Sequence, residues 1–137
     1  MAVLVLDVNV IAGYLLGAGA DREELSAFLL GPFDFIAPDI WRPELGNTLW
    51  KYIQKREITL DEAVALFQRA EPLVSDTISS RGLWQLALLL AAQNNHPVYD
   101  CLFIALAVLE DTMLVSYDRR LARKFGERVA LPAELLA

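Results

Sequence analysis

Short, unbroken runs of apolar residues alternate along this chain with longer segments whose apolar positions recur at helical spacing. Val3–Leu6 is apolar without alternation, which is typical of a strand buried on both faces, and "TMLVS" at residues 112–116 has the same character. Further extended segments are predicted at "FDFIAP" (33–38), at "PLVSDTIS" (72–79) and, at the edge of the sheet, at "RVAL" (128–131).

The segments between these strands have the periodicity and the start signals of helices. Helices are predicted at residues 10–16, 21–30, 43–56, 60–70, 80–94, 99–110 and 118–125. Asp21 with Glu24, and Thr59 with Glu62, have capping-box spacing, and Pro43 suits a first helical turn because the N–H that it lacks would have no helical partner there. Strands separated by helices predict a three-layer α/β fold with a mainly parallel sheet, formed as one domain over residues 1–137.

The cysteine and histidine counts exclude several kinds of functional site. Cys101 is the only cysteine and His96 the only histidine, so an internal disulfide, a Cys/His zinc site and a nuclease with two histidines are excluded. A lone cysteine favours a reducing cytoplasm. The apolar stretches are too short to span a membrane, and the start lacks the basic region of a secretory signal.

Two acids are predicted to lie where buried strands end. Asp7 follows the first strand, and Asp118 follows "MLVS" and opens the next helix. The carboxyl ends of parallel strands are where open α/β sheets bind ligands. Each acid also has a purely structural explanation, Asp7 as a turn residue and Asp118 as a helix N-cap.

Two further acids are predicted in the first turns of helices. Glu44 heads a polar face that continues through Asn47, Thr48, Lys51 and Lys55, opposite a core stripe of Leu45, Leu49, Tyr52 and Ile53. A solvated face would explain Glu44 equally well. Asp100 precedes "CLFIALAVL", an apolar helix in which an unpaired carboxylate is costly to bury unless capping donors or a cation satisfy it.

The four acids together are harder to explain as separate structural devices. Four carboxylates within a few ångströms of one another repel strongly unless they share protons or cations, and Mg²⁺ or Mn²⁺ suits such hard oxygen ligands. Asn9 and Ser116 are expected to add a neutral oxygen or to orient a carboxylate and a bound water. The net charge of −6 argues against nucleic-acid binding, but bound divalent cations would reverse the local sign.

Four pieces of the chain resemble the PIN-domain nucleases, and within them the VapC-type toxins of toxin–antitoxin pairs. They are "LDVNV" (6–10), "PELGNTLW" (43–50), "VYDCLFIALA" (98–107) and "LVSYDRRLA" (114–122). The resemblance implies an α/β/α sandwich and a metal centre made of Asp7, Glu44, Asp100 and Asp118. Asn9 matches a small polar residue of the family, and Ser116 replaces its common threonine while keeping the hydroxyl.

The resemblance also implies an activity and partners. PIN-type toxins cut RNA with Mg²⁺ or Mn²⁺, leave a 5′-phosphate and a 3′-hydroxyl, typically form homodimers and are silenced by a VapB-type antitoxin. In this chain the RNA contacts are expected from Lys51, Lys55, Arg119 and Arg120, with solvated helix faces as the alternative.

Other residues have simpler predicted roles, and two rival functions remain open. His96 is predicted to be a loop residue, Cys101 to pack in its helix, and Trp41, Trp50 and Trp84 to be core or interface anchors. Residues 14–16 are expected to pair subunits, to receive an antitoxin helix or simply to pack in the core. The rival functions are an Asp-based phosphoryl-transfer enzyme, such as a phosphatase or a receiver, and an interaction module that keeps the PIN shape without activity.

Overall fold

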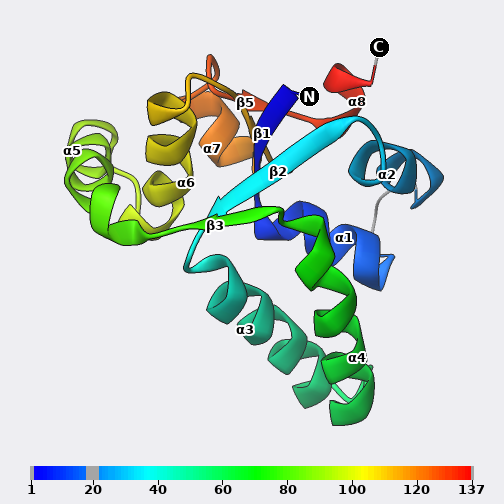
Figure 1. Cartoon of the computed structure of the whole chain (residues 1–137). Coiled ribbons are helices and arrows are strands. Elements are labelled where there is room, and N and C mark those ends of the chain that lie inside the picture. Colours follow the sequence, from blue (N-terminus) through cyan, green and yellow to red (C-terminus); the bar gives the residue numbers. More distant parts are fainter. Residues whose placement is uncertain (1, 18–21, 137) are drawn as a thin grey trace.

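Five parallel strands form the centre of the molecule (Figure 1). The computed structural model describes residues 2–17 and 22–136. The strands are β1 (Ala2–Leu6), β2 (Phe33–Pro38), β3 (Asp76–Ile78), β4 (Leu114–Val115) and β5 (Val129–Ala130). They lie in the order β3-β2-β1-β4-β5, and every neighbouring pair is parallel. The predicted α/β class with a mainly parallel sheet is confirmed.

Helices follow the strands as the periodicity predicts. They are α1 (Val8–Leu16), α2 (Arg22–Leu29), α3 (Trp41–Gln54), α4 (Leu60–Ala70), α5 (Trp84–Asn94), α6 (Val98–Leu109), α7 (Arg119–Lys124) and α8 (Pro132–Leu135), with 3₁₀ turns at Glu71–Leu73 and Ser80–Gly82. The Thr59–Glu62 capping box is formed, with both of its hydrogen bonds at 3.0–3.1 Å. None of the helices in the described ranges is long and apolar enough to cross a membrane.

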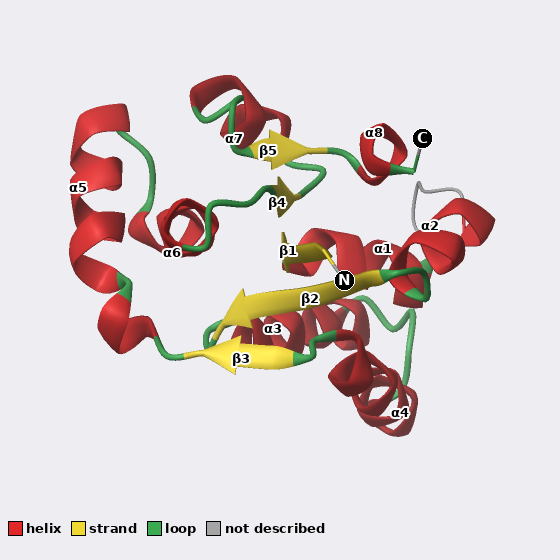
Figure 2. Ribbon diagram, turned by 45° about the horizontal axis from the view of Figure 1, so that its top comes forward, coloured by secondary structure: helices red, strands yellow, loops and turns green. Residues whose placement is uncertain are grey.

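The helices cover both faces of the sheet. The α5–α6 pair lies on one side and the α1–α2 pair on the other (Figure 2). Helix α6 packs against β1, β2 and β4, and its residues Cys101–Ala107 are all buried, which explains why this helix is apolar almost all round. Cys101 packs inside this layer as predicted.

The side of the sheet on which the chain adds strands changes between β1 and β4. From β1 the chain adds β2 and then β3 on one side, and it returns to add β4 and β5 on the other. Such a switch point is where the carboxyl ends of an open α/β sheet form a ligand crevice. Asp7 directly follows β1, and Ser116 directly follows β4. The topology therefore brings the two strand ends singled out in the sequence to one place.

The boundaries of several elements differ from those predicted. Helix α3 begins at Trp41, two residues before Pro43, so the proline still lies in the first turn. The helix predicted from Ser80 is divided into a 3₁₀ turn and α5, which begins at Trp84. Helix α8 was not predicted. The predicted cap residue Asp21 lies outside the described residues.

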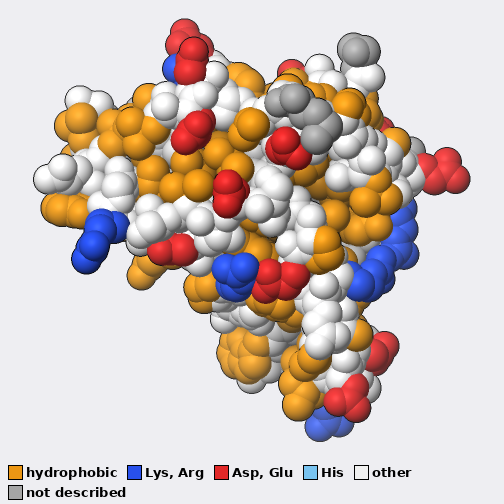
Figure 3. All heavy atoms as spheres, in the orientation of Figure 1, with side chains coloured by type: hydrophobic (Ala, Val, Ile, Leu, Met, Phe, Trp, Pro, Cys, Tyr) orange, Lys and Arg blue, Asp and Glu red, His pale blue; other side chains and the backbone are white. Residues whose placement is uncertain are grey.

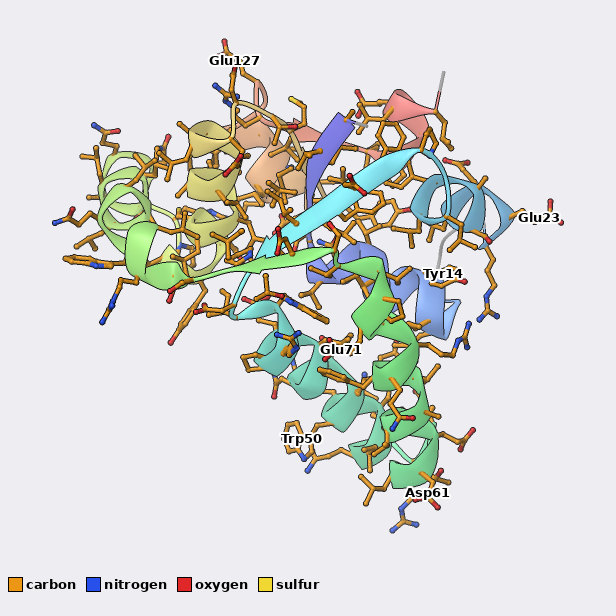
Figure 4. The ribbon with its side chains drawn as sticks, in the orientation of Figure 1. Tyr14, Glu23, Trp50, Asp61, Glu71 and Glu127 are labelled. Atoms are coloured by element: carbon orange, nitrogen blue, oxygen red, sulfur yellow. The ribbon has the colours of Figure 1, made fainter. Side chains whose placement is uncertain are left out.

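The three tryptophans have different environments. Trp41 is fully buried and stacks on Phe67, which makes it the core anchor that was predicted. About half of Trp50 and half of Trp84 are exposed. Figure 4 shows Trp50 on the outer side of the α3–α4 hairpin. These two side chains are therefore available to a partner.

Candidate metal centre

The four predicted acids line one cavity. Asp7, Glu44, Asp100 and Asp118 share a cavity of about 450 Å³, lined also by Asn9, Asn47, Thr48 and Tyr52 among others. Two of the acids come from the ends of β1 and β4, and two come from the first turns of α3 and α6. The structure thus brings together residues that are up to 111 positions apart in the chain, from residue 7 to residue 118.

A hydrogen-bonded network joins Asp7, Asn9, Ser116 and Asp118, which we call the strand-edge group. The Ser116 hydroxyl donates to Asp7 Oδ2 at 2.8 Å and accepts from Asn9 Nδ2 and from the Asp118 backbone N–H, both at 3.0 Å. Asn9 Oδ1 accepts from the Tyr117 backbone N–H at 3.0 Å. Ser116 is buried. Asn9 and Ser116 therefore orient a carboxylate, one of the two roles expected of them.

Both acids of the strand-edge group also cap helices. Asp7 Oδ1 accepts from the Val8 backbone N–H at 2.7 Å, and Asp118 Oδ1 accepts from the Leu121 backbone N–H at 3.0 Å. The structural explanation of these residues is thus correct as far as it goes. Because the two oxygens of a carboxylate together offer about four acceptor sites, these hydrogen bonds do not prevent the same side chains from facing the cavity.

Glu44 and Asp100, which we call the helix pair, have a much sparser environment. No hydrogen bond from a described residue reaches the Glu44 carboxylate. Asp100 is the third residue of α6, where an acid often accepts a hydrogen bond from the N-cap backbone. The N-cap here is Pro97, which has no N–H to donate. Asp100 therefore cannot take the capping-box role.

Burial and mutual repulsion disfavour full ionisation of the cavity. Burial raises the pKa of the Asp7 carboxyl to about 6, with the Ser116 hydrogen bond lowering it and the nearby charges of Asp100 and Asp118 raising it. Burial, and then the charges of Asp7 and Asp100, raise the pKa of Glu44 to about 7. Near neutral pH the cavity consequently binds protons, or any cation that replaces them, more readily than exposed carboxylates do.

The donor set fits a hard divalent cation. The acids supply carboxylate oxygens, which suit Mg²⁺ or Mn²⁺ and not a soft metal. Within the described ranges, no three His, Cys, Asp or Glu side chains are gathered tightly enough to form a finished metal cage. The four acids therefore line one pocket without forming a compact metal site.

The predicted RNA-binding residues lie outside this cavity. Lys51, Lys55, Arg119 and Arg120 are exposed, and none of them is among the described residues that line the acid cavity. Arg119 lines a second cavity of about 560 Å³. The two cavities share Asn9, Gly13 and Asp118 as a common wall, so at least Arg119 lies next to the acids.

Two residues at the site differ from their predicted roles. His96 does lie in the connection between α5 and α6, but it is buried, and its Nε2 lies 2.8 Å from Asp100 Oδ2. Tyr52 was assigned to the core stripe of α3, yet it lines the acid cavity. Its spacing of one turn from Thr48, on the polar face headed by Glu44, is the signal that identifies this position.

Residues 14–16 belong mainly to the core. Leu15 is buried, and Tyr14 and Leu16 pack against the core cluster. The guanidinium of Arg69 lies 5.9 Å from the centre of the Tyr14 ring, and Figure 4 shows Tyr14 on α1, close to the α4 side of the molecule. Of the alternatives left open for this segment, core packing describes Leu15.

Comparisons with known proteins agree with this architecture. Residues 4–126 match the family model of the PIN domain. The fold is similar to the crystal structure of PAE2754 from Pyrobaculum aerophilum, with a TM-score of 0.75, 15% identity and coverage of 98% of this chain and 88% of that one. It is also similar to a chain of a toxin–antitoxin complex from Klebsiella pneumoniae, with a TM-score of 0.64, 20% identity and coverage of 94% and 97%. No curated protein matches the sequence.

Proposed function

Because this chain belongs to the PIN domain family, we propose that it is a Mg²⁺- or Mn²⁺-dependent endoribonuclease and the toxin of a VapBC-type toxin–antitoxin pair. The observation that carries this proposal is the convergence of Asp7, Glu44, Asp100 and Asp118 on one cavity at the switch point of the sheet. The raised pKa values of Asp7 and Glu44 support it, since burial and then repulsion from the neighbouring acids disfavour the charged carboxylates, which a bound cation would favour.

Each acid has a role in this proposal that follows from its environment. Asp7, Asp100 and Asp118 would hold one or two ions, Asp7 in the orientation that the Ser116 hydroxyl sets. A bound ion would lower the pKa of its water and stabilise negative charge on the phosphate. Glu44 would complete the ligand set or accept a proton from the attacking water at its carboxylate. A pKa of about 7 suits that second role because the group can both take up and release a proton near neutral pH.

The RNA would be held by positive side chains around the acid cavity. Arg119 lines the second cavity, which adjoins the acid cavity, and Arg120 follows it in the chain. Lys51 and Lys55 are exposed at the C-terminal end of α3, the helix that carries Glu44. Such side chains contact phosphates and position the strand without reading its sequence. This arrangement would allow a protein with a net charge of −6 to bind a polyanion locally.

The proposed partners are a VapB-type antitoxin and a second copy of the chain, in the cytoplasm. The antitoxin is supported by the likeness of the fold to a chain of a toxin–antitoxin complex. The homodimer is supported by exposed apolar side chains on α5, including Trp84, Leu88 and Leu89. Figure 3 shows hydrophobic side chains gathered over the α5 and α6 side of the molecule. An unpaired, buried Cys101 is consistent with a reducing compartment.

Incubation of the purified protein with total RNA tests the proposed chemistry. We expect cleavage with Mg²⁺ or Mn²⁺, none with EDTA, and products that carry a 5′-phosphate. A generic phosphate ester in the same buffer should remain intact, which separates a nuclease from a phosphatase. Asp7→Asn should abolish the cleavage of RNA. Its matched control is Asp61→Asn, which makes the same chemical change on an exposed acid at the far end of the α3–α4 hairpin (Figure 4). Cleavage that persists in EDTA would overturn the proposal.

A further inference from the structure

We propose that His96 is a positioning residue for Asp100. His96 holds one oxygen of the Asp100 carboxylate so that the other oxygen is presented to the divalent cation. The inference rests on the proposed function. It is carried by the hydrogen bond between His96 Nε2 and Asp100 Oδ2 at 2.8 Å and by the depth at which the imidazole is buried. The His96 side chain is 2% exposed, whereas that of Asp100 is 39% exposed.

The hydrogen-bonding pattern of the imidazole points in one direction only. A carboxylate accepts and does not donate, so Nε2 carries the proton that is shared with Asp100. The other ring nitrogen, Nδ1, is buried and has no partner among the described residues. An orphaned buried nitrogen costs stability. The only polar contact of the ring in the described structure is therefore the one that reaches into the acid cavity.

The surrounding chain fixes the position of the ring. Asn95 adopts a left-handed conformation and ends α5, the His96 backbone N–H donates to the Ala91 carbonyl, and Lys124 Nζ donates to the Asn95 carbonyl at 2.6 Å. The imidazole and the Phe125 ring pack in a T-shaped arrangement, with 6.1 Å between the ring centres. Groups from both α5 and α7 thus hold the segment that delivers Nε2 to Asp100.

A purely structural role explains this arrangement poorly. Asp100 cannot accept the capping-box hydrogen bond of α6, because the N-cap residue Pro97 has no N–H. An apolar residue at position 96 would fill the same space without leaving a buried nitrogen unpaired. A buried polar side chain that costs stability is expected at a functional site. Partners that orient the ligands of a metal are worth about 10- to 100-fold in affinity.

Two matched substitutions separate positioning from packing. The amide nitrogen of glutamine occupies the place of Nε2, whereas that of asparagine occupies the place of Nδ1. His96→Gln therefore keeps a donor for Asp100 and His96→Asn does not, although both place an amide in the same buried segment. His96→Leu removes the donor and fills the space. Mn²⁺ affinity, measured by calorimetry and by the electron paramagnetic resonance signal of free Mn²⁺, is the readout, with urea unfolding in the absence of metal for comparison.

We expect His96→Asn and His96→Leu to bind Mn²⁺ about 10- to 100-fold more weakly than the wild type, and His96→Gln to restore binding close to the wild-type level. Equal affinities of the Asn and Gln variants, or an unchanged affinity in His96→Leu, would overturn the inference alone. Absence of Mn²⁺ binding in the wild type, or unchanged binding in Asp100→Asn, would instead overturn the proposed function and the inference with it.

Discussion

The two halves of the acid cavity are built in different ways. The strand-edge group, Asp7, Asn9, Ser116 and Asp118, is tied together by hydrogen bonds around one buried hydroxyl. The helix pair has a single described side-chain hydrogen bond, from His96 to Asp100, and none at the Glu44 carboxylate. The strand-edge group is therefore preorganised before any ligand binds. In the helix pair, His96 holds Asp100, whereas Glu44 is placed only by the packing of α3.

This difference predicts that the two halves respond differently to the same kind of substitution. Preorganised groups contribute to the stability of the fold, because removing one member leaves its partners without their hydrogen bonds. Glu44, whose carboxylate receives no hydrogen bond from a described residue, can be neutralised at little structural cost, and neutralisation can even relieve repulsion. Substitutions in the strand-edge group should therefore lower the stability of the metal-free protein, whereas neutralising Glu44 should not.

The largest effect is expected from removing a charge in either half. Asp7→Asn and Asp100→Asn should each lower RNA cleavage and Mn²⁺ affinity by at least about 100-fold, because losing a ligand costs more than losing a partner that orients one. Both variants should remain folded by circular dichroism. Cleavage assays and calorimetry check this, and full activity in either folded variant would refute its assignment.

Removing the hub of the strand-edge group should destabilise the protein without any metal. Ser116→Ala leaves Asn9 Nδ2 and the Asp118 backbone N–H without their acceptor, so the free energy of unfolding should fall by about 1–3 kcal/mol. Ser116→Thr keeps the hydroxyl and should lie much closer to the wild type. Urea unfolding measures both, and equal values for the two variants would show that the network is not needed.

Neutralising Glu44 should instead raise the free energy of unfolding of the metal-free protein. The folded-state pKa of Glu44, about 7, lies above the ordinary value of 4.5, so the folded protein binds more protons than the unfolded chain between these values. Stability without metal should consequently fall as pH rises from about 4.5 to 7. Glu44→Gln should remove part of this loss and raise the free energy of unfolding at pH 8 by about 1–2 kcal/mol, with little gain at pH 4. A gain of the same size at both pH values would exclude the ionisation of Glu44 as its source.

The smallest effect is expected outside the cavity. Reversing the charges of Lys51 and Lys55 together should weaken RNA binding several-fold and lower the slope of its logarithmic salt dependence by about 1.4, the value for two contacts with a single strand. Fluorescence anisotropy at several salt concentrations measures the slope. Mn²⁺ affinity should not change, because neither lysine lines the acid cavity. An unchanged slope would remove these lysines from the RNA contact.

Much of the fold follows from local patterns in the sequence. Unbroken apolar runs such as Val3–Leu6 identify parallel strands, although Val3 is exposed and only Leu4–Leu6 are buried. The Thr59–Glu62 box marks the start of α4. Element boundaries were less predictable. Helix α8 is only four residues long, too short to show a helical period. The break before α5 follows a 3₁₀ turn at Ser80–Gly82, which periodicity does not separate from the helix after it.

The site was partly predictable for a related reason. Asp7 and Asp118 could be placed together because strand ends in a parallel sheet meet at one edge. The partnership of His96 with Asp100 could not be inferred. It depends on the left-handed turn at Asn95 and on packing against Phe125, and neither leaves a mark on hydrophobic periodicity. Tyr52 illustrates the remaining difficulty, because an aromatic residue suits a core and a pocket wall equally well.

The hydrogen bond between Ser116 and Asp7 has a consequence for the making of the protein. Its two residues are 109 positions apart, and the strand that delivers Ser116 pairs with β1. A ribosome that has translated the first three strands, through Ile78, has supplied neither Ser116 as the hub for Asp7 nor Asp118. The centre can therefore assemble only after residue 118 has been translated, so a nascent chain that ends before that residue does not yet carry it.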